Sequence, residues 1–160
     1  MDRIDKILNH DLFLYHLGRN NAAEADRRFC RHGMVHFLDV ARIGTIIALE
    51  EGLKINREWI YAAALLHDCG KHEQYENGIP HEQASARIAP EILKACGFND
   101  EETGVIVTAI SRHRDPEAAK EKNLNGILYR ADKVSRACFA CDAEKDCNWK
   151  DGKKNLTIQY

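Results

Sequence analysis

Apolar residues recur at helical spacing through most of this chain, and almost no segment alternates apolar and polar residues as a strand does. In residues 34–49, MVHFLDVARIGTIIAL, apolar positions cover more than half of a helical wheel, as a helix in the middle of a bundle requires. The final residues, NLTIQY, are the one stretch compatible with a short strand. The spacing therefore predicts an all-α fold with a central helix over 34–49.

Turn and capping residues set the expected limits of the other helices. A helix is expected over 2–17, a second from Asn56 to Gly70, and a third from His81 to Gly97 that is kinked or interrupted at Pro90. Two more are expected, one capped by residue 99 or 100 and ending near 113, the other over 124–137. No repeat or low-complexity linker divides the chain. We therefore expect a single domain over 1–160, an orthogonal helical bundle with an N-terminal helical extension (1–30) and a cysteine-containing C-terminal tail (138–160).

Charge and the N-terminal sequence narrow the class of protein. Charged residues make up 30% of the 160 residues but nearly cancel, to a formal net charge of -2, so no global basic field attracts long nucleic acid. The first 21 residues contain neither a signal-peptide apolar core nor a membrane-spanning stretch. We expect a cytoplasmic protein with no membrane partner. In reducing cytosol, metal binding or simple burial explains six cysteines better than disulfides do.

Histidines and aspartates on several predicted helices are candidate metal ligands. His36, the adjacent pair His67 and Asp68, and Asp132 stand on three different helices that a bundle can bring together. His81 and His113 add two imidazoles, and six such ligands can hold two ions roughly 3.5–4 Å apart with a carboxylate such as Asp68 between them. Imidazoles and carboxylates favour Fe, Mn or Zn. Spacing alone leaves buried, hydrogen-bonded histidines as the alternative.

The sequences around these residues indicate a family. Over residues 32–136, five segments resemble, in order and spacing, the HD-domain superfamily of metal-dependent phosphohydrolases. They are HFLDVARIGTIIALEEG, AALLHDCGKH, IPHEQASARIAPEIL, TAISRHRD and LYRADKVSR. The resemblance implies that the family's histidine, HD doublet and late aspartate are His36, His67, Asp68 and Asp132. Two-metal members, such as HD-GYP phosphodiesterases and YqeK-like dinucleoside tetraphosphate hydrolases, add histidines that His81 and His113 resemble. No GYP signature is present, and Arg114 replaces a second HD-GYP histidine, so cyclic dinucleotide hydrolysis is not indicated.

The resemblance implies a metal-dependent phosphohydrolase of the HD-domain fold. It would hydrolyse a nucleotide or other small phosphate ester through a metal-activated water, with two divalent transition ions. Asp68 would bridge the ions, and Lys71, in an HDxGK arrangement, would contact a phosphate oxygen. One arginine beside the ligands is expected to contact phosphate as well: the candidates are Arg112, Arg114 and Arg130. The remaining histidines match no motif and are interpreted as surface or structural residues: His10, His16, His32 and His72.

The family pattern does not account for the cysteines near the C-terminus. Cys138, Cys141 and Cys147 form a C-x2-C-x5-C motif, and Cys30 precedes His36 by six residues just as Cys138 follows Asp132. If His36 and Asp132 meet at the metal, these four thiols lie near each other and would make a structural zinc or iron–sulfur site. The alternative is that they are buried small apolar groups or exposed thiols, which is the interpretation given to Cys69 and Cys96.

Two other functions remain compatible with the same residues. One is a di-iron oxygenase, because some HD-domain proteins that this ligand set resembles use two irons to activate oxygen. The other is a non-catalytic sensor, in which the HD core binds a nucleotide or metal and the cysteines report redox state or metal supply. Loss of activity without oxygen would favour the first, and binding without turnover would favour the second.

Overall fold

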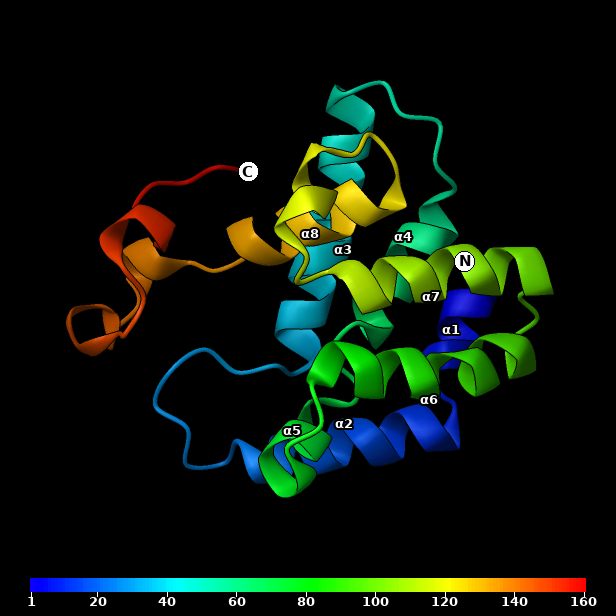
Figure 1. The fold of residues 1–160 in the computed structure, drawn as a ribbon, viewed down its shortest axis with the longest axis horizontal. Helices are drawn as coiled ribbons and strands as arrows, with labels where there is room; N and C mark the ends of the chain where they lie inside the picture. Colours follow the sequence, from blue (N-terminus) through cyan, green and yellow to red (C-terminus); the bar gives the residue numbers. More distant parts are fainter.

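The computed structural model covers residues 1–160, and all of its regular secondary structure is helical (Figure 1). The α-helices are α1 (Asp2–Leu8), α2 (Asp11–Ala23), α3 (Met34–Glu50), α4 (Arg57–Leu66), α5 (Lys71–Asn77), α6 (His81–Ala95), α7 (Asp100–Arg112) and α8 (Leu124–Val134). Short 3-10 turns are η1 (Pro116–Lys120), η2 (Cys138–Ala140), η3 (Glu144–Asp146) and η4 (Asp151–Lys153). The all-α prediction is confirmed. No helix combines the length and the apolar character needed to cross a bilayer.

Helix α3 lies in the middle of the bundle, as its apolar circumference predicted. It packs against α4 and α8, and α7 contacts α4, α6 and α8. In Figure 1, α3 runs across the direction of α2, α6 and α7, which is the crossed arrangement of an orthogonal bundle. The buried apolar residues on its inner face include Phe37, Val40, Ala41 and Ile47. The core is therefore built around the helix that carries His36 in its first turns.

The N-terminal segment forms two helices where the sequence predicted one. α1 ends before Asn9, and the His10 ring then caps α2 by accepting a 3.2 Å hydrogen bond from the Leu12 amide through Nδ1. Ile4 and Ile7 on α1 and Phe13 on α2 enter the same hydrophobic cluster as α3 and α4. A side-chain cap thus explains the break, and apolar burial holds both helices on the bundle.

Three other local expectations have different outcomes. α6 runs without interruption from His81 to Ala95 with Pro90 inside it, because Ile88, Ile92 and Leu93 bury its inner face and outweigh one missing backbone hydrogen bond. The end of the chain, NLTIQY, forms no strand, since this helical protein offers no sheet edge for it to pair with. The predicted cap at Asn99 is confirmed, and it forms a full capping box with Glu102.

The turn after α4 is clamped by two neighbouring helices. His67 is the C-cap of α4, and Asp68 follows it. A Cβ at Gly70 would lie 2.7 Å from the Ser85 backbone nitrogen, so only glycine lets α6 approach this closely. The Gly70 amide donates to Ser85 Oγ at 3.0 Å, and Asn20 Nδ2 on α2 donates to the Asp68 carbonyl at 2.8 Å. These contacts fix the direction of the two side chains that begin the site.

Candidate metal centre

Six side chains that are far apart in the sequence meet at one buried place in the bundle. α3 supplies His36, the turn after α4 supplies His67 and Asp68, and the start of α6, the end of α7 and α8 supply the other three. Each of the six has at most 9% of its surface exposed. They are the six residues singled out by the sequence: His36, His67, Asp68, His81, His113 and Asp132. They form two groups of potential ligand atoms that share Asp68.

The first group joins two imidazoles to two carboxylates. His36 Nε2 lies 3.8 Å from Asp68 Oδ2 and 3.4 Å from Asp132 Oδ1. His67 Nε2 lies 3.2 Å and 3.8 Å from the same two oxygens. All four ligand atoms are within 4.8 Å of one another. This spacing suits one cation between four ligand atoms.

The second group uses the other oxygen of Asp68. Asp68 Oδ1 lies 3.2 Å from His81 Nε2 and 3.5 Å from His113 Nε2, and these two ring nitrogens are 3.1 Å apart. One carboxylate therefore presents Oδ2 to the first group and Oδ1 to the second. This is the position of a carboxylate that bridges two ions.

Backbone carbonyls fix the tautomers of two of the histidines. His67 Nδ1 is 2.7 Å from the Ala64 carbonyl oxygen, and His113 Nδ1 is 2.7 Å from the Ile110 carbonyl oxygen. A carbonyl can only accept, so each Nδ1 carries a proton. The Nε2 lone pair is then free to point into the site, which is how metal-binding imidazoles are usually oriented. Each carbonyl belongs to the last turn of the helix that precedes its histidine.

Electrostatics favour the ligand forms of most of these groups. Burial would raise the pKa values of Asp68 and Asp132, but the surrounding imidazoles outweigh it and hold both well below their usual range. Burial lowers the pKa of His36, and it lowers that of His81 to about 3. Burial also opposes protonation of His67, but Asp68 and Asp132 outweigh it and raise its pKa to about 10. The two carboxylates thus attract a positive charge to the place where His67 Nε2 points.

Unsatisfied polar atoms at the centre fit a bound cation. His36 Nε2, His67 Nε2 and Asp68 Oδ1 are buried and have no hydrogen-bond partner. Such atoms are rare in folded proteins because burying them unpaired costs about 1–3 kcal/mol each. They converge from three separate elements, and they are the nitrogen and oxygen ligands that Fe, Mn and Zn accept. The site therefore fits divalent transition metals.

One residue at the edge of the centre was not predicted. His32, interpreted from the sequence as surface or structural, is buried and directs Nε2 to within 3.9 Å of Asp68 Oδ2. Its Nδ1 lies 2.6 Å from Glu24 Oε1, and the Tyr75 hydroxyl also donates to that oxygen at 2.6 Å. Its position four residues before His36 was a weak signal, since His32 precedes the first residue of α3. His32 therefore borders the site on the side of the loop 24–33.

The other three unmatched histidines lie away from the ligands. His16 and His72 hydrogen-bond to each other at 2.8 Å between Nδ1 and Nε2, and His10 caps α2. Their interpretation as surface or structural residues agrees with these positions.

Glu24 gives a pH-dependent prediction. Burial opposes its ionisation, but hydrogen bonds from His32 and Tyr75 outweigh burial and lower its pKa from the usual 4.5 to about 2. Its charge therefore stabilises the folded state above pH 4.5, and this contribution is lost as the pH falls towards 2. Glu24→Gln should lower the free energy of unfolding by roughly 1.5–3 kcal/mol at pH 7, the range for a hydrogen bond to a charged group. Urea titrations of both proteins should show this difference shrinking below pH 4.5; a constant difference would contradict it.

A cavity of about 410 Å³ opens onto the centre. Asp68, His81 and Asp132 form part of its wall. The rest of the lining is strongly cationic, with no acidic residue besides the two aspartates; its positive side chains are Arg27, Lys71, Arg114, Lys133 and Arg136. Trp149 from the C-terminal tail also lines it, with the Arg136 guanidinium carbon 5.2 Å from the indole centroid. The cavity suits a small anionic ligand with a flat group.

The four basic residues that the sequence suggested as phosphate contacts lie in different places in the structure. Lys71 is buried in the cavity wall, with Nζ 3.1 Å from His81 Nδ1, and burial lowers its pKa. Of the three arginines, Arg114 lines the cavity. Arg112 is paired with Asp115 and Glu121, whereas Arg130 is paired with Glu51. Lys71 and Arg114 are therefore the two of these four residues that can reach a ligand.

The cysteines fall into two sets. Cys69 and Cys96 are buried in the core, as predicted. The other four are half-buried and line a second cavity, of about 560 Å³, between the loop 24–33 and the C-terminal tail: Cys30, Cys138, Cys141 and Cys147. The sequence prediction that these four share one place in the structure is compatible with this arrangement.

The site is thus a set of buried histidines and aspartates that could hold metal ions, placed in an all-α bundle beneath a cationic cavity. The HD domain model matches residues 33–137, which is more than half of the chain and contains all six clustered residues. The chain belongs to the HD domain family.

Individual proteins are also similar to this chain. An uncharacterized protein of Clostridium beijerinckii is 50% identical over 160 residues, the whole of both chains. Ribonuclease Y of Mesoplasma florum is 31% identical over 102 residues, which are 64% of this chain but only 18% of that protein. The crystal structure of a predicted HD superfamily hydrolase from an uncultured Thermotogales bacterium matches with a TM-score of 0.64 at 23% identity, covering 89% of this chain and 81% of that one. This last match shows a shared fold.

Proposed function

We propose that this protein is a metal-dependent phosphohydrolase that acts on a small phosphate ester, with two divalent ions (Fe, Mn or Zn) held by the six clustered residues. The observation that carries the proposal is the double role of Asp68, whose two oxygens face two different groups of ligands. His36, His67 and Asp132 would complete one ion's ligands, and His81 and His113 the other's. Family membership supports the same class of chemistry.

The surrounding residues are suited to a phosphate group. When bound, divalent ions at this centre would activate a water molecule and neutralise charge on phosphoryl oxygens. Lys71 would contribute a point charge beside His81, and Arg114 and Arg136 would contribute planar donors that match phosphate geometry. Burial strengthens these interactions, because the effective dielectric around the ligands is lower than in water.

The cavity favours a nucleotide among small phosphate esters. Trp149 and Phe29 offer aromatic surfaces in the same space as the cationic residues, and a base can stack on such a ring. A volume of about 410 Å³ suits one small ligand. The similarity to a protein named ribonuclease Y also supports chemistry at nucleotide phosphates, although this chain spans only 18% of that protein. We expect mononucleotides or dinucleotides to be better substrates than long RNA.

The function is tested by metal analysis and a substrate panel. The protein is purified without air, loaded with Fe²⁺, Mn²⁺ or Zn²⁺, and assayed with nucleoside phosphates, dinucleotides, a short oligoribonucleotide and simple aryl phosphates. We expect about two ions per chain and release of phosphate or nucleotide in the absence of oxygen. Turnover that requires oxygen would favour the oxygenase alternative. Nucleotide binding without turnover would favour the sensor alternative.

Trp149 supplies a prediction about substrate choice. Trp149→Ala should raise KM for nucleotides roughly ten- to hundredfold, the range expected for loss of one base–aromatic stack. An aryl phosphate too small to reach the indole should be hydrolysed with nearly unchanged kcat/KM. Trp149→Phe is the matched control, since it retains an aromatic face. An equal loss for both substrates would indicate that Trp149 supports the tail and does not contact a base.

A further inference from the structure

The C-terminal tail, residues 138–160, has an ordered path but almost no hydrophobic core of its own. Its regular structure is three short 3-10 turns, and Ala143 is its only buried residue. Asn155 Nδ2 fastens the far end by donating to the carbonyls of Lys133 and Arg136 at 2.8 and 2.9 Å. In the middle of the tail, Lys154 Nζ donates to the Glu144 carbonyl at 3.1 Å and to its carboxylate at 2.7 Å, and Asp146 pairs with Arg28 of the loop 24–33. These are polar contacts only, and short segments without a core usually need a covalent or metal link.

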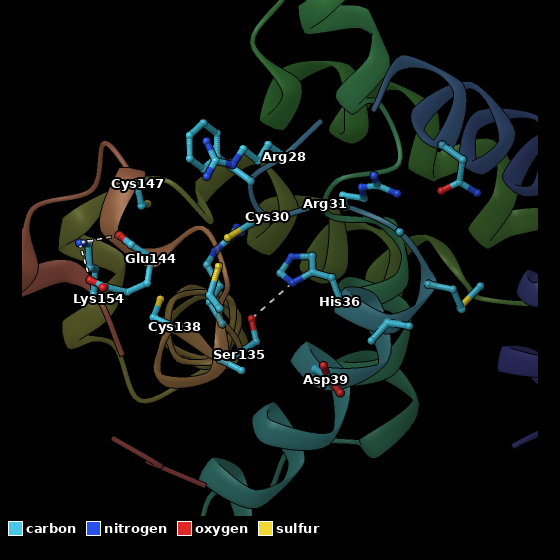
Figure 2. Close-up of a pocket in the computed structure, with 18 residues that line it drawn as sticks. Arg28, Cys30, Arg31, His36, Asp39, Ser135, Cys138, Glu144, Cys147 and Lys154 are labelled. Atoms are coloured by element: carbon cyan, nitrogen blue, oxygen red, sulfur yellow. Dashed lines mark hydrogen bonds and ion pairs between the residues drawn. The ribbon is translucent and has the colours of Figure 1, made fainter. Parts of the chain in front are cut away.

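Four thiols stand where the tail faces the loop 24–33. Figure 2 shows Cys30, Cys138 and Cys147 among the residues that line the 560 Å³ cavity, and Cys141 also lines it. The turns position them: Cys138 opens η2, Cys141 closes it, and Cys147 is the residue after η3. Cys30 comes from a part of the chain more than a hundred residues away. The four side chains thus line one cavity from two segments that are otherwise joined by the exposed Arg28–Asp146 ion pair.

Cations outnumber carboxylates around these thiols. Arg28, Arg31, Arg136 and Lys154 line the same cavity, against Asp39 and Glu144, although Arg28 is paired with Asp146 and Lys154 with Glu144. The Arg136 guanidinium lies beside the Cys30 thiol, and its buried Nε has no hydrogen-bond partner. Four thiolates around a metal carry net negative charge, and neighbouring cations stabilise that charge. The unpaired Nε is therefore explained if the thiols are held as thiolates.

We propose that Cys30, Cys138, Cys141 and Cys147 bind an iron–sulfur cluster that ties the tail to the loop. Zinc with Zn–S bonds of about 2.3 Å would draw four sulfurs into close mutual contact. Neither of the compact groups of ligand atoms, which lie within 4.8 Å of one another, contains a cysteine. Iron–sulfur clusters also take four cysteine thiolates but place iron and sulfide between them, so they span a wider set of thiols than a single ion does.

The cluster would lie in the wall of the substrate cavity. Cys30, Cys138 and Cys147 line both cavities, and Trp149 follows Cys147 by two residues. Holding these three cysteines would therefore fix the part of the tail that carries Trp149 over the metal centre. This assignment stands on residues outside the six-ligand centre and does not depend on the proposed hydrolysis.

Acid-labile sulfide is the decisive measurement, because the six-ligand centre holds none. The full chain is purified without air, reconstituted with ferrous iron and sulfide, desalted, and analysed for iron, zinc, sulfide and visible absorption. We expect about two or four sulfides per chain, according to cluster type, with a brown colour. The Cys138→Ser, Cys141→Ser double variant should lose all sulfide, while Cys96→Ala, which changes a core cysteine, should keep it.

A folding defect is separated from loss of the cluster by two further readouts. The double variant should retain its far-UV circular dichroism and the ions at the six-ligand centre. Asp68→Asn should keep its sulfide, so failure of the hydrolase proposal leaves this one intact. A sulfide-free protein that holds one zinc ion, lost in the double variant, would overturn the cluster in favour of zinc. Equal metal and sulfide in wild type and double variant would overturn the site altogether.

Discussion

Replacing Asp68 by asparagine should remove both metal ions and lower kcat/KM at least about a thousandfold. The two oxygens of this carboxylate lie 3.2 Å from His67 Nε2 and 3.2 Å from His81 Nε2, so one substitution affects both groups of ligands. Asparagine is neutral and offers a single acceptor oxygen. Because bound ions contribute several kcal/mol of charge stabilisation, and 1.36 kcal/mol is a tenfold change in rate, their loss accounts for a decrease of this size.

The fold should survive this substitution. The side chain changes little in shape, and the backbone carbonyl of residue 68 keeps its hydrogen bond from Asn20. Elemental analysis, kinetics and far-UV circular dichroism on the same preparation separate loss of metal from unfolding. Asp100→Asn, which alters an exposed carboxylate paired with Lys94, is the matched control and should retain both ions. Two ions and full activity in Asp68→Asn would contradict the proposed centre.

The limits of the helices could be predicted where a single chemical signal dominates. The apolar circumference of 34–49 identified α3, and Asn99 with Glu102 identified the start of α7. The break between α1 and α2 was missed because it depends on one ring nitrogen of His10, which apolar spacing does not report. Pro90 does not interrupt α6, because its local cost is outweighed by packing that belongs to the tertiary structure.

The six residues that cluster in the bundle could be predicted, whereas much of the cavity could not. His67 and Asp68 are adjacent and follow an apolar helix, so a local pattern marks them. His32 and Glu24 lie around an irregular loop, and their contact with the centre exists only after that loop has folded over Asp68. Trp149 reaches the cavity from the tail for the same reason. Contacts made by irregular segments leave no periodic signal in the sequence.

A double substitution of His81 and His113 by asparagine should reduce the metal content from about two ions to about one. Both imidazoles face Asp68 Oδ1, and neither belongs to the group formed by His36, His67, Asp68 and Asp132. That group keeps all four of its ligands and should hold its ion. Hydrolysis should fall at least about a hundredfold, because one ion cannot stabilise both the attacking and the leaving oxygen.

Elemental analysis of the double variant, with His10→Gln as a control outside the centre, decides between two arrangements. Retention of one ion with little activity indicates two separable positions that act together. Loss of both ions from a folded protein would contradict this, since it would mean that Asp68 holds the first ion only when His81 and His113 fix its orientation. Removal of His81 has a second effect, because Lys71 Nζ lies 3.1 Å from His81 Nδ1 and loses this contact in the double variant. Adding Lys71→Met to the double variant removes this amine, and the remaining ion should stay in place if the two positions are independent.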